Sequence, residues 1–237
     1  MENRLLRIFT VVVALGSLLT SCTKVTVDKK VYVDSYIHSI YNRSGQPVFS
    51  VLHSAFCYAA LSGVSVKGST GSATTLAKGT VDGFSFYTQI DSTNYKTTPP
   101  FPDTYTYTAT YEAGDVFTGT ELTSGAYLLP AVGLNATKTT TDIVLAWKPV
   151  SNAGAYKVRI FYDDGSATAR TMIYESDFLV PLSATADLSI PYSLTNLSQY
   201  LNSYISFEVS AFIFQQGQDT YEAVSSATCR NKFLSSN

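Results

Sequence analysis

The sequence is poor in the residues that carry most enzyme and metal chemistry. Its 237 residues include three cysteines, two histidines and one tryptophan, and only 14% are charged. No CxxC, HExxH or calcium-loop pattern occurs, so no metal site is expected. At strand spacing, Cys57 lies about 13 Å along the chain from His53, so the local sequence does not place this cysteine and either His53 or His38 together for nucleophilic catalysis. We therefore expect a non-enzymatic protein with no catalytic residue, cofactor or metal.

Basic residues are also too few to indicate a nucleic-acid partner. The chain has 16 Lys and Arg residues against 18 Asp and Glu residues, which gives a net charge of −2. Binding to a phosphate backbone requires clustered Lys and Arg. A weak acidic excess provides no such cluster, so we exclude nucleic acid as a partner.

The N-terminus has the three parts of a secretory leader. Arg4 and Arg7 form a basic region, residues 8–15 and 18–19 form an apolar region, and Ser21 is the small residue before the expected cleavage point. The apolar region is shorter than the about 20 residues of a membrane-spanning helix. The pattern therefore predicts that residues 1–21 are a cleaved leader.

The segment Leu19-Thr20-Ser21-Cys22 resembles the lipobox of a bacterial lipoprotein signal peptide. The resemblance implies that the sulfur of Cys22 carries lipid, which would tether the mature chain to a membrane through residues 22–30. Thr23, not Asp, follows the cysteine, which resembles sorting to the outer membrane. Whether the protein faces the periplasm or the cell surface stays open.

The mature part, residues 22–237, has the composition of an all-β protein. Tyr, Thr, Ser and Val are abundant, and these residues suit a pleated, half-buried surface better than a helix. The length accommodates one large or two ordinary domains.

The second half contains alternating patterns that predict strands. Ile143, Leu145 and Trp147 alternate with polar or small residues, and Trp147 is expected in the core. The strands and the segment between them resemble a fibronectin type III domain over residues 138–232. The resemblance is carried by Asp142–Pro149, Ala155–Phe161, Leu194–Leu197 and Ile205–Ala211.

The first half predicts a second sandwich, with an immunoglobulin-like fold over residues 31–131. Strands are expected over Tyr32–Ile40, Val48–Ala60, Phe84–Ile90 and Tyr105–Tyr111, separated by Gly- and Ser-rich turns. Residues Leu134–Thr141 are interpreted as a linker between the domains. A single continuous β architecture is the alternative.

Two cysteines remain in the mature part besides Cys22. An oxidising compartment would permit a bridge between Cys57 and Cys229. The sequence spacing does not show that they are close, so we favour two small buried apolar residues instead.

Two groups of aromatic residues are candidate ligand or partner contacts. In the predicted late strands, Phe161, Phe212 and Phe214 point away from the expected core and would form one apolar patch, unless that face packs against the first domain. The proline-rich segment 95–107 offers Tyr95, Phe101 and Tyr105 on a stiff loop. Its alternative role is to cover the end of the sandwich.

Together, these sequence features predict a lipid-anchored binding module. Composition and layout resemble Bacteroides-like lipoproteins, and the resemblance implies a role in adhesion or in binding a glycan or protein ligand at the outer membrane. A structural subunit of an envelope complex is the alternative function.

Overall fold

The structure, a computed structural model, describes residues 28–80, 83–163, 170–179, 186–191, 200, 203–217 and 220–232. Within these ranges the all-β prediction is confirmed, because strands form three sheets and the helical residues are limited to the short 3-10 turn η1 (Ser92–Asn94) and Tyr200. The predicted leader, Cys22 and Leu194–Leu197 lie outside the described residues. In the part that is described, no helix has the length and apolar character needed to cross a membrane.

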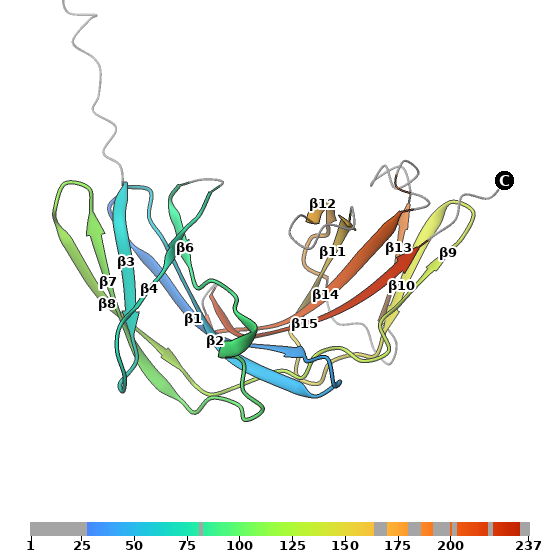
Figure 1. Cartoon of the computed structure of the whole chain (residues 1–237), viewed down its shortest axis with the longest axis horizontal. Coiled ribbons are helices and arrows are strands. Elements are labelled where there is room, and N and C mark those ends of the chain that lie inside the picture. The colour runs from blue at the N-terminus through green and yellow to red at the C-terminus, as the bar shows by residue number, and fades with distance from the viewer. Residues whose placement is uncertain are drawn as a thin grey trace, which may run out of the picture.

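One long sheet runs through the whole molecule and joins its two halves. It has eight strands in the order β12-β11-β14-β15-β1-β2-β6-β5. At its centre, β1 (Tyr32–Tyr41) pairs parallel with β15 (Tyr221–Lys232) and antiparallel with β2 (Pro47–Phe56). The remaining strands of this sheet are β5 (Ala77–Lys78), β6 (Ser85–Tyr87), β11 (Ala155–Asp163), β12 (Arg170–Glu175) and β14 (Tyr204–Phe214). Figure 1 shows that the central strands form a curved floor from which both ends of the molecule rise.

A smaller sheet covers each end of the long one. The described residues of 28–123, here termed the N-terminal lobe, contain a sheet of order β4-β3-β7-β8, and those of 135–232, the C-terminal lobe, a sheet of order β13-β10-β9. These strands are β3 (Leu61–Lys67), β4 (Thr74–Thr75), β7 (Asp103–Tyr111), β8 (Val116–Thr123), β9 (Asn135–Lys138), β10 (Asp142–Trp147) and β13 (Ala186–Pro191).

Each lobe has its own apolar core between its two layers. In the C-terminal lobe, Trp147 is buried with Val158 and Phe207, as the alternating pattern predicts. In the N-terminal lobe, Tyr107 and Ala109 point into the core while the threonines of β7 point outward. The period-two pattern therefore identified the inward face of these strands correctly.

The segment interpreted as a linker is partly a strand. Asn135–Lys138 forms β9, which pairs antiparallel with β10, and Ala136 is buried in the C-terminal core. The interpretation of Leu134–Thr141 as a linker was therefore wrong. Four residues rich in Asn, Thr and Lys are too short and polar to show an alternating pattern, and the neighbouring strand supplies the hydrogen-bond partners.

Cys57 and Cys229 are unpaired, as favoured from the sequence. Cys57 is buried in the N-terminal core, and Cys229 packs against the C-terminal core, where burial raises the pKa of its thiol to about 11. Both side chains therefore act as small apolar residues.

Candidate functional site

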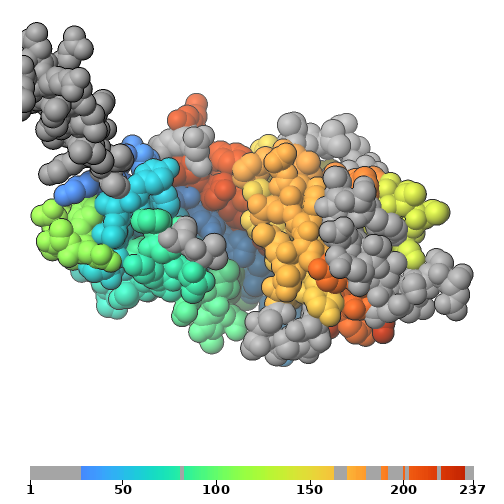
Figure 2. Space-filling view, turned by 90° about the horizontal axis from the view of Figure 1, so that it is seen from above, coloured from blue at the N-terminus to red at the C-terminus, as the bar shows by residue number. Residues whose placement is uncertain are grey.

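A groove of about 1050 Å³ lies on one face of the long sheet, where the two lobes meet. Seen from above, the blue segment of β1 and β2 lies between the green part of the N-terminal lobe and the orange part of the C-terminal lobe (Figure 2). The side chains that line it and are used below are Tyr36, His38, Arg159, Glu208, Phe212 and Tyr221.

Strand register brings these distant residues onto one face. Ser226 of β15 is opposite Ser210 of β14, and Glu208 of β14 is opposite Arg159 of β11. On the other side of β15, His38 of β1 is opposite Val224, which lies two residues from Ser226. Since side chains two residues apart on a strand share a face, all these groups point to the same side of the sheet.

A chain of hydrogen bonds crosses the sheet between the lobes. His38 Nδ1 lies 2.6 Å from the hydroxyl of Tyr95, and His38 Nε2 lies 3.1 Å from Ser226 Oγ. Ser226 and Ser210 are joined by a hydroxyl contact of 3.0 Å, and Ser210 Oγ donates to Glu208 Oε1 at 3.4 Å. The chain therefore links the N-terminal lobe to the charged residues of the C-terminal lobe.

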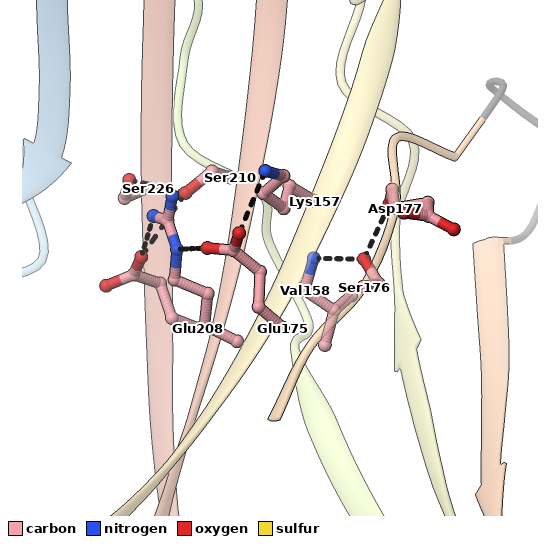
Figure 3. A network of polar contacts seen from close by, with 9 residues as sticks. Lys157, Val158, Glu175, Ser176, Asp177, Glu208, Ser210 and Ser226 are labelled. Atoms are coloured by element: carbon pink, nitrogen blue, oxygen red, sulfur yellow. Dashed lines mark hydrogen bonds and ion pairs between the residues drawn. The ribbon is translucent and has the colours of Figure 1, made fainter. Parts of the chain in front are cut away.

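The positive and negative charges at the C-terminal-lobe end of these hydrogen bonds balance each other. Arg159 donates to Glu208 at 3.1 Å and to Glu175 at 2.6 Å, and Lys157 donates to Glu175 at 3.0 Å. Figure 3 shows Lys157 and Glu175 meeting, with Glu208 on the other side of the network. The hydrogen bond from Arg159 lowers the pKa of Glu175, so this carboxylate is ionised at neutral pH. Two cations thus face two carboxylates.

His38 adds no charge to the groove at neutral pH. Its side chain is buried, and this desolvation lowers its pKa to about 4. Burial likewise raises the pKa of the Tyr95 hydroxyl to about 12. A neutral imidazole donates through one nitrogen and accepts through the other, which matches its two hydroxyl partners.

An aromatic cluster borders the polar chain and also spans both lobes. Its members are Tyr36, Phe178, Phe212, Phe214 and Tyr221. The ring centres of Phe178 and Phe212 are 5.1 Å apart at 88°, and those of Tyr36 and Tyr221 are 5.7 Å apart, also at 88°. Such edge-to-face contacts are favourable geometries for aromatic pairs.

The structure brings together two of the three phenylalanines expected in one patch. Phe212 and Phe214 stack 6.3 Å apart, but Phe161 is opposite Ser206, six residues or about 20 Å along β14 from Phe212. The prediction of a single three-phenylalanine patch was therefore wrong. Instead of Phe161, Phe178 packs against Phe212 and Phe214. Phe178 is 43% exposed, whereas Phe212 is only 4% exposed.

The predicted aromatic loop surface is not formed either. Tyr95 is buried against His38, and the ring of Tyr105 packs 4.6 Å from that of His53. Only Phe101 is open to solvent, with 82% of its surface exposed. The prolines do not keep Tyr95 in the loop, because the neighbouring Lys96 pairs with Phe49 of β2 and draws Tyr95 against the long sheet.

His53 is half-buried, lines a second hollow and belongs to a second polar cluster. Its Nδ1 is 2.8 Å from Ser35 Oγ, which is 2.6 Å from the hydroxyl of Tyr107. Ser35 is fully buried, so a substrate has no access to its hydroxyl. Among the described residues no group of three His, Cys, Asp or Glu side chains is arranged to hold a metal ion. The expectation of a non-enzymatic protein stays a prediction.

No protein-family model matches the sequence, and neither does any curated protein. Solved structures similar to the chain include one of a cytokine receptor complex, at 12% identity and a TM-score of 0.29, covering 82% of this chain and 98% of that chain. A candidate carbohydrate-binding protein from Bacteroides uniformis has 13% identity and a TM-score of 0.35, over 84% of this chain and 98% of its own. A 1.5-MDa bacterial ice-binding adhesin has 12% identity and a TM-score of 0.26, over 87% of this chain and 66% of its own. At these values the similarities carry no argument about function.

Proposed function

We propose that the protein is a non-enzymatic binding module that holds a neutral, hydroxyl-rich ligand of the glycan class in the groove between its lobes. The observation that carries the proposal is a groove of about 1050 Å³ in which aromatic rings adjoin a polar chain. Ligand sites combine apolar and aromatic walls with a few placed polar groups. A sugar ring matches both parts, because its C–H face packs on an aromatic ring and its hydroxyls pair with polar side chains.

Charge in the groove supports a neutral ligand. Arg159 and Lys157 are paired with Glu175 and Glu208, so this network has no unpaired positive charge that could bind a phosphate or carboxylate. The low pKa of His38 keeps its imidazole neutral above about pH 4. At this network an anionic ligand would have to displace a carboxylate from Arg159; Arg170, which also lines the groove, lies outside the network.

Replacing Tyr221 with alanine tests the groove. Its ring lines the groove and contacts both Tyr36 and Phe212, so the variant should weaken ligand binding about tenfold or more, the usual effect of removing an aromatic anchor. The measurement is a glycan-array screen followed by calorimetry on the best ligand. Phe101→Ala is the matched control, because Phe101 is exposed but does not line the groove. Equal losses in both variants, or a loss in Phe101→Ala alone, would reject the groove.

The proposal places this module at the outer membrane through lipid on Cys22. Its support is the Leu19-Thr20-Ser21-Cys22 segment that follows the short apolar run. In Cys22→Ser we expect less than about a tenth of the protein to stay with washed membranes, because no acyl chain remains to anchor it. Incorporation of labelled palmitate is the second readout. Cys229→Ser serves as the control and should remain membrane-bound and labelled; a Cys22→Ser protein that fractionates in the same way would disprove the anchor.

We further propose that the lobes correspond to an immunoglobulin-like sandwich over residues 31–131 and a fibronectin type III-like sandwich over residues 138–232. Support comes from the C-terminal lobe, where β13-β10-β9 covers β12-β11-β14-β15. Seven strands in two layers around a buried tryptophan are typical of this class of sandwich. The pairing of β1 with β15 then joins the two sandwiches by a shared sheet.

A further inference from the structure

The groove between the lobes continues onto the N-terminal lobe. The second hollow, which His53 lines, has a volume of about 850 Å³ and extends to Tyr87 of β6. It shares Tyr36, Leu52 and Ile90 with the groove, so the two depressions have a common border. The long sheet therefore carries one depression in two parts, with one part on each lobe.

Strand register shows that both parts lie on the same face of the long sheet. Tyr36 of β1 is opposite Leu52 of β2. Two residues further along β2, Ser54 is opposite Tyr87 of β6. Residues that are directly opposite, and residues two apart on one strand, point to the same side of a sheet. Phe86, the neighbour of Tyr87, points the other way and is buried in the N-terminal core.

The floor of this depression is longer than a single sugar. From β6 to β11 the sheet passes through β2, β1, β15 and β14. Five steps between neighbouring strands, at about 4.8 Å each, give about 24 Å measured along the sheet. Figure 1 shows β6 on one side of this floor and β11 and β12 on the other. One sugar ring cannot reach both sides, whereas a chain of several sugars can.

The second hollow combines exposed apolar surface with polar groups, as the groove does. Tyr87 is 43% exposed and Ile90 is 67% exposed, so both offer apolar surface to a ligand. Gln89, Asp91 and Ser92 supply hydrogen-bonding groups along the same border. Apolar and aromatic surface with a few placed polar groups is typical of ligand sites.

The charge of the second hollow favours a neutral ligand. The described residues that line it include no lysine or arginine. Hydrogen bonds from the backbone and side chain of Thr93 lower the pKa of Asp91, so this carboxylate is ionised at neutral pH. Burial lowers the pKa of His53 to about 4, so its imidazole is neutral. An anion would be repelled by Asp91, whereas a sugar hydroxyl can donate a hydrogen bond to it.

Hydrogen bonds hold the border of the second hollow in place. The backbone N–H of Thr88 donates to the carbonyl of His53 at 2.9 Å, and the backbone N–H of His53 donates to Thr88 Oγ1 at 2.9 Å. A few residues on, Asp91 Oδ1 accepts from the backbone N–H of Thr93 at 2.9 Å and caps η1. A surface that is fixed before binding loses less conformational entropy when a ligand binds.

We propose that the groove and the second hollow form one extended cleft that binds a linear, neutral glycan chain of several sugar units. Tyr221 lies in one subsite and Tyr87 in the other. This inference rests on the proposed function and adds to it the length of the ligand and a second binding site. A chain that occupies both parts binds more tightly than a short sugar, because its second contact is made within the same complex.

A series of chain lengths tests the extended cleft. Calorimetry on the full chain measures the affinity for neutral gluco-, xylo-, manno- and galacto-oligosaccharides from mono- to hexasaccharide. In at least one series the hexasaccharide should bind about tenfold or more tightly than the disaccharide, with one hexasaccharide per chain. A hexasaccharide that binds no more tightly, or two hexasaccharides per chain, would overturn the extended cleft. No binding in any series would overturn the proposed function as well.

Replacing Tyr87 with alanine separates the two subsites. The variant should bind the hexasaccharide about tenfold more weakly and the disaccharide as before, because only the longer chain reaches the second hollow. Tyr221→Ala should weaken the binding of both lengths. Tyr204→Ala is the matched control, since Tyr204 is 46% exposed but lines neither part of the cleft, and it should bind like the natural chain.

The pattern across these variants distinguishes the two proposals. A loss in Tyr221→Ala with none in Tyr87→Ala would leave the proposed function standing and overturn the extended cleft. Unchanged binding in Tyr221→Ala would overturn both. Thermal unfolding of each variant shows whether it is folded, and the unchanged disaccharide affinity of Tyr87→Ala provides a second check within the same protein.

Discussion

Replacing Ile37 with alanine should destabilise both lobes at once, lowering the free energy of unfolding by about 2 to 5 kcal/mol. Ile37 is 1% exposed and lies in β1 between Ala223 of β15 and Val51 of β2. The substitution leaves a cavity at the point where the strands of the two lobes hydrogen-bond to each other. Since a whole domain is stabilised by only about 5 to 15 kcal/mol, the loss is large.

Calorimetry of the full chain checks this result and the organisation of the fold. If the parallel pairing of β1 with β15 joins the lobes into one cooperative unit, the chain should unfold in a single transition, and Ile37→Ala should move it to lower temperature. Val66→Ala and Val158→Ala, which are buried in the N-terminal and C-terminal cores, should move the same transition. Two transitions, with Val66→Ala shifting only one, would instead show the two independent domains predicted from the sequence.

Acidification from pH 6.5 to 4 should remove about 3 kcal/mol of stability through His38 alone. Burial lowers the pKa of His38 to about 4 in the folded protein, whereas the unfolded chain has the usual value of 6.5. Above pH 6.5 both states are neutral and the stability is complete. As the pH falls, the unfolded state binds the proton first, so stability is lost until the folded state also protonates near pH 4.

Two other groups titrate in the same window and must be included. Burial lowers the pKa of His53 to about 4, which adds a loss in the same direction. Burial raises the pKa of Asp34 to about 6, so Asp34 acts in the opposite sense: the folded state binds a proton first, and stability is gained as the pH falls from 6 towards 3.8. Two histidines against one carboxylate give a net loss on acidification.

Urea unfolding at pH 7.5 and 4.5 measures these contributions. His38→Gln should lose less stability on acidification than the natural chain, because glutamine does not titrate and still hydrogen-bonds in the buried site. Asp34→Asn should lose more, because the opposing gain is removed. An NMR titration should place the midpoint of the His38 imidazole near pH 4. A midpoint near 6.5 would contradict the explanation.

The strands were predicted best where the core pattern is long and regular. Over Ile205–Ile213, five alternating apolar residues identified the buried face of β14. The same logic failed for β9, whose four polar residues form a strand because β10 lies beside them. Phe178 was missed for a related reason, since it follows β12 in a segment with no alternating pattern and meets Phe212 only in the fold.

The candidate site was predicted only in part. Phe212 and Phe214 were expected on one outer face, and they do lie together, but Phe161 does not. The polar chain from His38 through Ser226 to Glu208 was not predicted at all. Its members come from separate strands, so no spacing along the chain indicates that they meet.

The sequence alone determined the all-β class and the inward faces of the longest strands. These properties depend on local alternation and on side-chain chemistry, which are readable within a few residues. The tertiary structure alone decided that His38 lies opposite Val224, and with it the joined sheet and the groove. The backbone N–H and C=O groups of a strand are the same in every sequence, so they do not select a partner strand. Pairing between strands that are far apart in the sequence therefore depends on how whole layers pack.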